Sequence, residues 1–395
     1  MNTHHAHHID YKRHTASLDG LRGVAISLVF LYHYYPRQSS NPISVVASIG
    51  WIGVDIFFVL SGFLITGILF DTLGKTHNLR NFFARRALRL FPVYLLMVAL
   101  VVALAHPLHI PLGWKDVPFF AYGANFCPAF GIVPDFGPYV RFRHLWSLAV
   151  EEQFYLLWAP LVCLLGSRRR IVMACFVGIT TAVVLRVVGV NHVSTITLYQ
   201  NIFTRMDSIL CGSLLALALR GDNSESWLNR SRLHWAFVLG VLIIGSCFVL
   251  SRSLHSERIP TLRVGYFGSD LWCTALLGLT LLPATQVNRW TNSPVLRFIG
   301  RYSYGLYLWH DIPGHAFDRW ATYSQHLFRP MWLSSLVGTA SLFGFCLLLA
   351  IASYHAIELP CLHLKRYFTY DAPSPRESYP VEDDSIDLRP AEPSL

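Results

Sequence analysis

Long apolar stretches recur along the whole chain and are separated by short, arginine-rich polar segments. An apolar run of roughly 20 residues is long enough to cross the hydrocarbon core of a bilayer as an α-helix. We expect spans at residues 20–36, 48–70, 88–106, 144–166, 171–190, 195–219, 233–251, 266–284, 296–311 and 331–357. Two fit the pattern less well, because 195–219 contains two charged residues and 296–311 is short. The pattern predicts an all-α integral membrane protein with about ten transmembrane helices.

Composition supports this class. Hydrophobic residues make up 53% of the 395 residues, charged residues only 14%, and the mean hydropathy is +0.41. Soluble domains carry about 25% charged residues. A water-soluble fold cannot bury so much apolar surface, whereas a fold that faces lipid has no need to. The composition therefore excludes a soluble or merely surface-bound globule.

The charge distribution predicts the orientation in the membrane. Of the 32 Lys and Arg residues, 21 fall on the side of the N-terminus and 9 on the opposite side, which by the positive-inside rule places both termini in the cytoplasm. The basic residues behind the net charge of +9 stand in short clusters between apolar runs. That arrangement suits lipid headgroups rather than a groove along nucleic acid, so no nucleic-acid partner is expected.

The remaining segments predict a single multi-spanning domain over residues 18–366. Residues 1–17, which are His-rich, and the Pro-, Ser- and acid-rich tail 367–395 are expected to be disordered and cytoplasmic. The longest outer loop, 107–143, is rich in aromatics and is either an acceptor-binding lid or a packed cap. The eight cysteines are scattered without a Cys-x-x-Cys pair, so neither a disulfide framework nor a metal site is expected.

The first span carries the sharpest chemical pattern. Arg22 and His33 are eleven residues apart, which is three helical turns plus about 20° and a rise of about 16 Å. Both side chains therefore share one face, with the guanidinium at the cytoplasmic boundary and the imidazole deeper in the membrane. This geometry suits an anion grip and a proton-transfer group. The alternative is that His33 merely bonds a neighbouring helix.

Two further arginines begin the third span. Arg86 and Arg89 are three residues apart and so share a helix face at the cytoplasmic surface. Paired guanidinium groups bind phosphate in a bidentate manner. The alternative is a topology anchor, which is common at this position.

Other ionisable residues within predicted spans include Asp55, Glu151, Glu152, Arg205 and Asp207. Such groups are costly in the membrane, so we expect them to face the protein interior and to pair. The first three lie at a depth similar to that of the histidine in the first span. For Arg205 and Asp207 we favour a structural role between helices.

Several motifs in order along the chain resemble the membrane-bound acyltransferase family 3, over about residues 16–365. They are Arg22-x10-His33, Gly53-Val-Asp-Ile-Phe-Phe-Val-Leu-Ser-Gly-Phe-Leu-Ile, Arg86-x-x-Arg89-x-x-Pro92, Trp146-Ser-Leu-x-x-Glu151 and Gly300-x-x-Ser303-Tyr-Gly-Leu-Tyr-Leu-Trp-His310. The resemblance implies a multi-pass enzyme of the inner (plasma) membrane that moves an acyl group, often acetyl, from cytoplasmic acyl-CoA to a hydroxyl of a saccharide, glycolipid or other acceptor. It implies acyl-CoA as donor substrate and no bound cofactor.

The same resemblance implies residue roles. His33 is the catalytic residue, and Arg22, Arg86 and Arg89 bind the donor. On physical grounds the imidazole acts as general base, with Asp55 or Glu151 orienting its ring. Other polar residues are expected to have structural or acceptor-side roles: Ser61, Glu152, Arg205, Asp207, Ser303 and His310.

Two other classes of protein compete with an enzyme. Intramembrane charges also mark the pathways of secondary transporters, although no matching pair of Gly/Pro-interrupted spans occurs in the two halves of the chain. A scaffold or receptor gives no reason for Arg22 and His33 to share a face. We therefore favour the acyltransferase, and keep the transporter as the main alternative.

Overall fold

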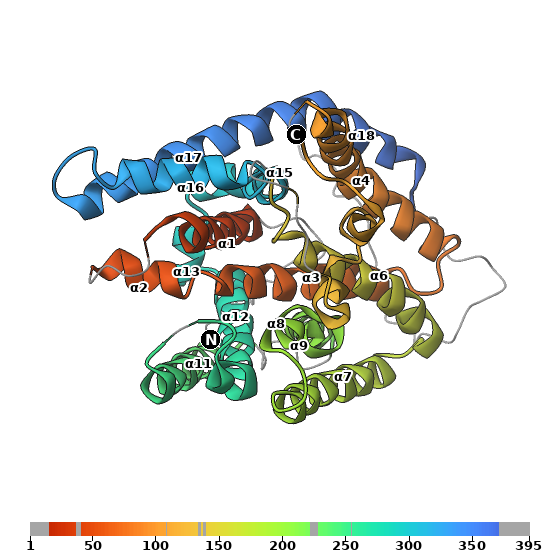
Figure 1. The fold of residues 1–395 in the computed structure, drawn as a ribbon. Coiled ribbons are helices and arrows are strands. Elements are labelled where there is room, and N and C mark those ends of the chain that lie inside the picture. The colour runs from red at the N-terminus through yellow and green to blue at the C-terminus, as the bar shows by residue number, and fades with distance from the viewer. Residues whose placement is uncertain are drawn as a thin grey trace, which may run out of the picture.

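The computed structural model describes residues 16–36, 41–107, 109–132, 136, 140–221, 228–253 and 255–370, and no strand occurs in these ranges (Figure 1). Of the segments predicted to be disordered, 1–17 and 367–395, all but residues 16–17 and 367–370 lie outside the described residues. The longer helices are α1 (Ala16–Tyr34), α3 (Ile52–Asp71), α4 (Asn78–Ala105), α6 (Leu145–Leu165), α7 (Arg168–Gly189), α9 (Ile202–Ala218), α11 (Arg230–Ser251), α12 (Tyr266–Leu281), α16 (Gly314–Ser324) and α17 (Met331–Ser353).

Shorter elements connect these helices. They are α2 (Pro42–Ser48), η1 (Trp114–Asp116), α5 (Val117–Phe120), η2 (Ala124–Phe130), α8 (Thr195–Gln200), η3 (Thr261–Gly265), α13 (Gln286–Thr291), α14 (Pro294–Arg301), α15 (Ser303–Trp309), η4 (Tyr354–Glu358), α18 (Leu359–His363) and η5 (Leu364–Tyr367). In the predicted outer loop, η1, α5 and η2 form short turns whose aromatic rings pack together, for example Phe136 against Phe142 at 4.6 Å. The described part of this loop is thus packed internally, and its residues Phe119, Ile132 and Phe142 also line a cavity of the bundle.

Helix α3 is the centre of the fold. It packs against α1, α6, α9 and α12, and Figure 1 shows it crossing the middle of the molecule. In the most apolar stretch of α3, 83% of the residues are buried within the protein, whereas in that of α11 only 17% are buried. A membrane helix that is apolar all round but mostly exposed faces lipid, so α11 lies at the lipid surface and α3 inside the bundle.

Within the described residues, six helical segments are long and apolar enough to cross a membrane: Ile52–Asp71, Asn78–Ala105, Leu145–Leu165, Arg168–Gly189, Arg230–Ser251 and Met331–Tyr367. This confirms the all-α membrane class, but the predicted number of ten spans is not confirmed. Two predicted spans are divided. Span 195–219 breaks at Asn201, whose side chain caps α9 by accepting a hydrogen bond from Phe203 N at 3.0 Å, and span 296–311 breaks at Tyr302 between α14 and α15.

Glycines allow α3 and α9 to approach closely. A Cβ at Gly62 would lie 1.7 Å from the carbonyl oxygen of Ile209, and one at Gly212 would lie 1.9 Å from that of Val59. Small residues serve this purpose between membrane helices, where dispersion and polar contacts replace the hydrophobic effect as the driving force. The two glycines therefore fix the spacing between the central helix and its nearest neighbour.

Buried ion pairs join the same helices. Arg205 on α9 pairs with Asp55 on α3, and both side chains are fully buried. Ser269 on α12 donates to the second oxygen of Asp55 at 2.6 Å, and Arg186 on α7 pairs with Asp207 at 2.5 Å. These contacts correct the prediction that Asp55 orients His33. Its carboxylate is engaged inside the helix core, because an arginine buried beside it has to be neutralised.

We predict that Gly212→Ala lowers the melting temperature of the detergent-solubilised protein. In an ordinary helix this change is favourable by about 1 kcal/mol, but here the new methyl group overlaps the backbone of α3 and overpacking costs about 1–3 kcal/mol. Thermal unfolding measured by intrinsic fluorescence checks the prediction. Gly344→Ala on α17 is the control, since a Cβ there meets nothing within 4 Å. Equal melting temperatures for the two variants would contradict the close packing.

We also predict that Asp55→Asn destabilises the fold by about 3–5 kcal/mol, because it leaves the buried charge of Arg205 uncompensated. The readouts are the yield of monodisperse protein and its melting temperature. Asp71→Asn is the matched control on the same helix. Asp71 also pairs with an arginine, Arg220 at 2.7 Å, but its side chain is 25% exposed, so solvent compensates part of the loss. The prediction fails if the two variants are equally stable.

Candidate active site

Two cavities lie next to each other in the bundle. The arginine cavity, of about 680 Å³, is lined by Arg22, Arg85, Arg86, Arg89, Arg301 and Lys365 together with three acidic side chains. The histidine cavity, of about 520 Å³, is lined by His33, His144 and His255 and by several aromatic rings. The two ends of α1 thus open into different cavities, since Arg22 lines the first and His33 the second.

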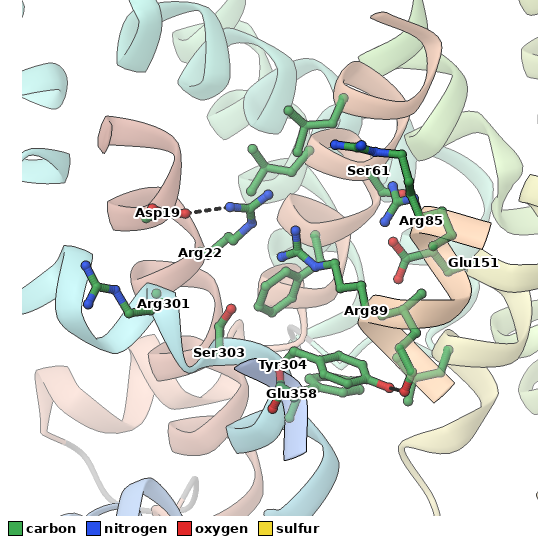
Figure 2. A pocket seen from close by; sticks show the side chains of 18 of the residues that line it. Asp19, Arg22, Ser61, Arg85, Arg89, Glu151, Arg301, Ser303, Tyr304 and Glu358 are labelled. Carbon is green, nitrogen blue, oxygen red and sulfur yellow. Dashed lines mark hydrogen bonds and ion pairs between the residues drawn. The ribbon is translucent and has the colours of Figure 1, made fainter. Parts of the chain in front are cut away.

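The arginine cavity brings together all three arginines that the sequence singled out. Arg22 on α1 and Arg89 on α4 extend into the same space, as Figure 2 shows, and Arg86 lines it one turn earlier on α4. Because α1, α4 and the C-terminal segment all contribute basic side chains, positive charge exceeds negative charge around the cavity. Such a site suits a ligand with more than one negative group.

A hydrogen-bonded cluster around Tyr155 positions the guanidinium of Arg86 in the arginine cavity. The phenol of Tyr155 donates to Glu151 and lies 2.5 Å from Ser61 Oγ. The guanidinium of Arg86 stacks over the same phenol ring, 4.5 Å from its centroid. Glu151 therefore belongs to the arginine cavity, and the prediction that it orients His33 is also corrected. Arg22 is held by Asp19 at 2.6 Å.

The C-terminal segment closes one side of this cavity. Arg85 donates to the carbonyl oxygens of Lys365 and Phe368 at 3.1 and 3.0 Å, and Asn81 donates to that of Thr369 at 2.7 Å. Lys365 and Tyr370 are then among the lining residues. No pattern in the sequence singles out Arg85 or Lys365, because they meet at the cavity only when the chain end folds back onto α4.

In the histidine cavity one nitrogen of His33 is fixed by the backbone. Nδ1 lies 2.8 Å from the carbonyl oxygen of Val29, four residues earlier in α1. A carbonyl oxygen only accepts, so Nδ1 carries the proton and Nε2 keeps its lone pair. The backbone of α1 thus fixes the tautomer in which Nε2 of His33 can accept a proton. Neither of the two carboxylates that the sequence suggested is needed for this.

Two more histidines stand beside His33. The ring of His310 lies 4.9 Å from that of His33 and 4.9 Å from that of His144. Asp311 is fully buried beside them and pairs with Arg143 Nη2 at 3.1 Å. His310 is packed behind the cavity wall, with Nδ1 2.7 Å from Tyr307 O. Of the other predicted polar residues, Ser303 lines the arginine cavity and Glu152 is half-buried outside both linings.

The two cavities meet at Val54 and Tyr307, which line both of them. Val54 lies on α3 and Tyr307 on α15, and the hydroxyl of Tyr307 bonds to that of Ser147 at the start of α6. We call this shared wall of Val54 and Tyr307 the septum. At the septum the cavity with the arginines adjoins the cavity with His33.

Sequence reasoning overlooked several residues of this site. His144, Tyr155 and Tyr307 stand inside the conspicuous motifs around Glu151 and Ser303, but spacing alone assigns them no partner. Val54 is one apolar residue among many in its span. These four residues are identified only by their positions in space, which depend on how α3, α6 and α15 pack.

The chain resembles known proteins over most of its length. A family model described as acyltransferase domain matches residues 15–354. The peptidoglycan O-acetyltransferase OatA of Listeria monocytogenes is 31% identical over 318 residues, covering 76% of this chain and 49% of the relative. The putative peptidoglycan O-acetyltransferase YrhL of Bacillus subtilis strain 168 is 30% identical over 375 residues, covering 90% of this chain and 56% of the relative.

The O-acetyltransferase OatA of Staphylococcus aureus is 28% identical over 323 residues, covering 75% of this chain and 50% of the relative. The chain thus spans about half the length of these relatives. No solved structure matches the chain significantly. The family match confirms the resemblance drawn from the ordered motifs: the chain belongs to the acyltransferase domain family, as an all-helical, multi-pass membrane member.

Proposed function

We propose that the protein is a membrane O-acyltransferase that moves an acyl group, acetyl in the first instance, from acyl-CoA to a hydroxyl of a saccharide acceptor. The observation that carries the proposal is a pair of cavities that share Val54 and Tyr307. One cavity is lined by arginines and the other by His33. The names of the relatives, which are peptidoglycan O-acetyltransferases, support an acetyl donor and a saccharide acceptor.

The arginine cavity is the donor site in this proposal. Acyl-CoA is a polyanion joined to a long flexible arm, and the arginines of α1 and α4 suit its phosphates. The positive-inside pattern of the chain supports a cytoplasmic opening for this cavity, in the plasma membrane. The rise of about 16 Å between Arg22 and His33 is a length that the arm spans when it carries the thioester to the septum.

His33 acts as general base from the other side. Nε2 takes the proton of the acceptor hydroxyl while the oxygen attacks the thioester carbon. A C–O bond forms, the C–S bond breaks, and the leaving thiolate recovers the proton from the imidazolium, so the products are the ester and CoA. Aromatic side chains such as Trp146 and Tyr199 offer the sugar apolar faces in the histidine cavity.

We predict that His33→Ala lowers kcat about 10²- to 10⁴-fold, the range expected for loss of a general base, while acyl-CoA affinity stays unchanged. Purified protein in lipid nanodiscs, supplied with radiolabelled acetyl-CoA and a soluble oligosaccharide, provides the assay. The complementary variant Arg89→Gln is expected to raise KM for acetyl-CoA about tenfold or more, because a charge-assisted contact contributes about 1.5–3 kcal/mol. Near wild-type kcat in His33→Ala would contradict the base, and transport of acceptor by proteoliposomes without CoA would favour a transporter.

A further prediction concerns the septum. Val54→Trp is expected to reduce transfer about a hundredfold without changing acyl-CoA binding, because small misplacements of reacting groups cost about that much. The smaller step Val54→Met should have a graded effect. Val184→Trp on the exposed face of α7 adds the same bulk toward lipid and serves as control. Full transfer by a folded Val54→Trp variant would show that the acyl group does not pass this wall.

A further inference from the structure

His144 stands at a position where a ligand is expected. It immediately precedes α6, is only 2% exposed, and lines the histidine cavity together with His33. Neither of its ring nitrogens has a hydrogen-bond partner among the described residues. A buried polar group left without a partner costs about 1–3 kcal/mol. The cavity side of His144 is therefore suited to a polar atom of a bound molecule.

A buried carboxylate lies behind this ring. Nδ1 of His144 is 3.8 Å from Oδ2 of Asp311, an oxygen that accepts from the backbone N–H of Arg143 at 3.1 Å. The other oxygen, Oδ1, accepts from the guanidinium of Arg143 at 3.1 Å and lies 3.4 Å from that of Arg141. A carboxylate at this position orients an imidazole and stabilises positive charge on it. His33 differs, because its own Nδ1 is bonded to a backbone carbonyl.

His33 and His144, two of the three histidines that line this cavity, have different partners, and such a difference suits different steps of one reaction. Resting on the function proposed above, we propose that His144 is a second catalytic residue, whose N–H donates a hydrogen bond to the carbonyl oxygen of the thioester. When the acceptor oxygen adds to the carbonyl carbon, the π electron pair moves onto this oxygen and His144 stabilises the oxyanion. The proton of the acceptor goes to His33 and then to the departing thiolate, so His144 undergoes no net change.

The position of His144 fits this role. It precedes Leu145 at the N-terminal end of the 21-residue helix α6, where the helix dipole favours negative charge. Ser147 of the same helix turn bonds to Tyr307 of the septum, where the thioester arrives. His310 does not serve equally well, because its ring is packed behind those of His33 and His144 and lies outside the described lining of the cavity.

The test compares glutamine with leucine at both histidines in the nanodisc assay. Glutamine keeps an N–H donor but is no base. We expect His144→Leu to lower kcat about 10²- to 10³-fold, as for loss of one oxyanion donor, and His144→Gln to stay within about tenfold of wild type. At His33 both replacements should be equally inactive, because a base is required there. His234→Leu, on the exposed face of α11, is expected to behave as wild type.

Each other outcome is decisive. Equal loss in His144→Gln and His144→Leu, with acyl-CoA binding and melting temperature intact, overturns the donor role, and so does full activity in both. If His144→Leu does not fold, His144→Met, which is unbranched and adapts to its surroundings, replaces it in the same comparison. Activity in the two His33 variants refutes the proposed base whatever happens at His144, so the two failures are distinguishable.

Discussion

The structure depends on one helix that reaches from a cavity lined by arginines to a cavity lined by His33. Helix α1 carries Arg22 at one end and His33 eleven residues later, and its rise fixes a separation of about 16 Å between them. The other helices of the site contribute residues to one or both of the cavities at the ends of α1. Helix α4 adds arginines at the first end, α3 and α15 form the septum, and His144 stands directly before α6. At the centre of the bundle α3 packs against both α1 and α6.

Buried charge is handled in two different ways in the bundle. In the core, Asp55 is matched with Arg205 and Asp207 with Arg186, so these charges hold α3, α7 and α9 together. In the histidine cavity, by contrast, the ring nitrogens of His144 make no hydrogen bond among the described residues, and the carboxylate of Asp311 lies 3.8 Å from Nδ1. Both arrangements matter because the protein interior has a low dielectric constant. There a matched ion pair rigidifies the fold, and a polar group without a hydrogen bond is stabilised strongly when a ligand supplies one.

Local spacing was enough to predict part of this arrangement. The shared face of Arg22 and His33, and the neighbouring pair Arg86 and Arg89, follow from helix periodicity, and the apolar runs predict the all-α membrane class. Pairing across helices was not predictable in the same way. Asp55 turns toward Arg205 rather than toward the histidine because glycines bring α3 against α9, and this contact joins residues about 150 positions apart. The predicted number of ten spans is not confirmed, and in one of them, 195–219, Asn201 caps a new helix within an apolar run.

The most direct test of the central claim is a cryo-EM structure of the protein in nanodiscs with a non-hydrolysable thioether analogue of acetyl-CoA. The account predicts density for the phosphates against Arg22, Arg86 and Arg89, with the pantetheine arm running along α1 and the sulfur at Val54 and Tyr307, facing His33. Analogue bound with its phosphates away from these arginines, or with its sulfur remote from the septum, would contradict it.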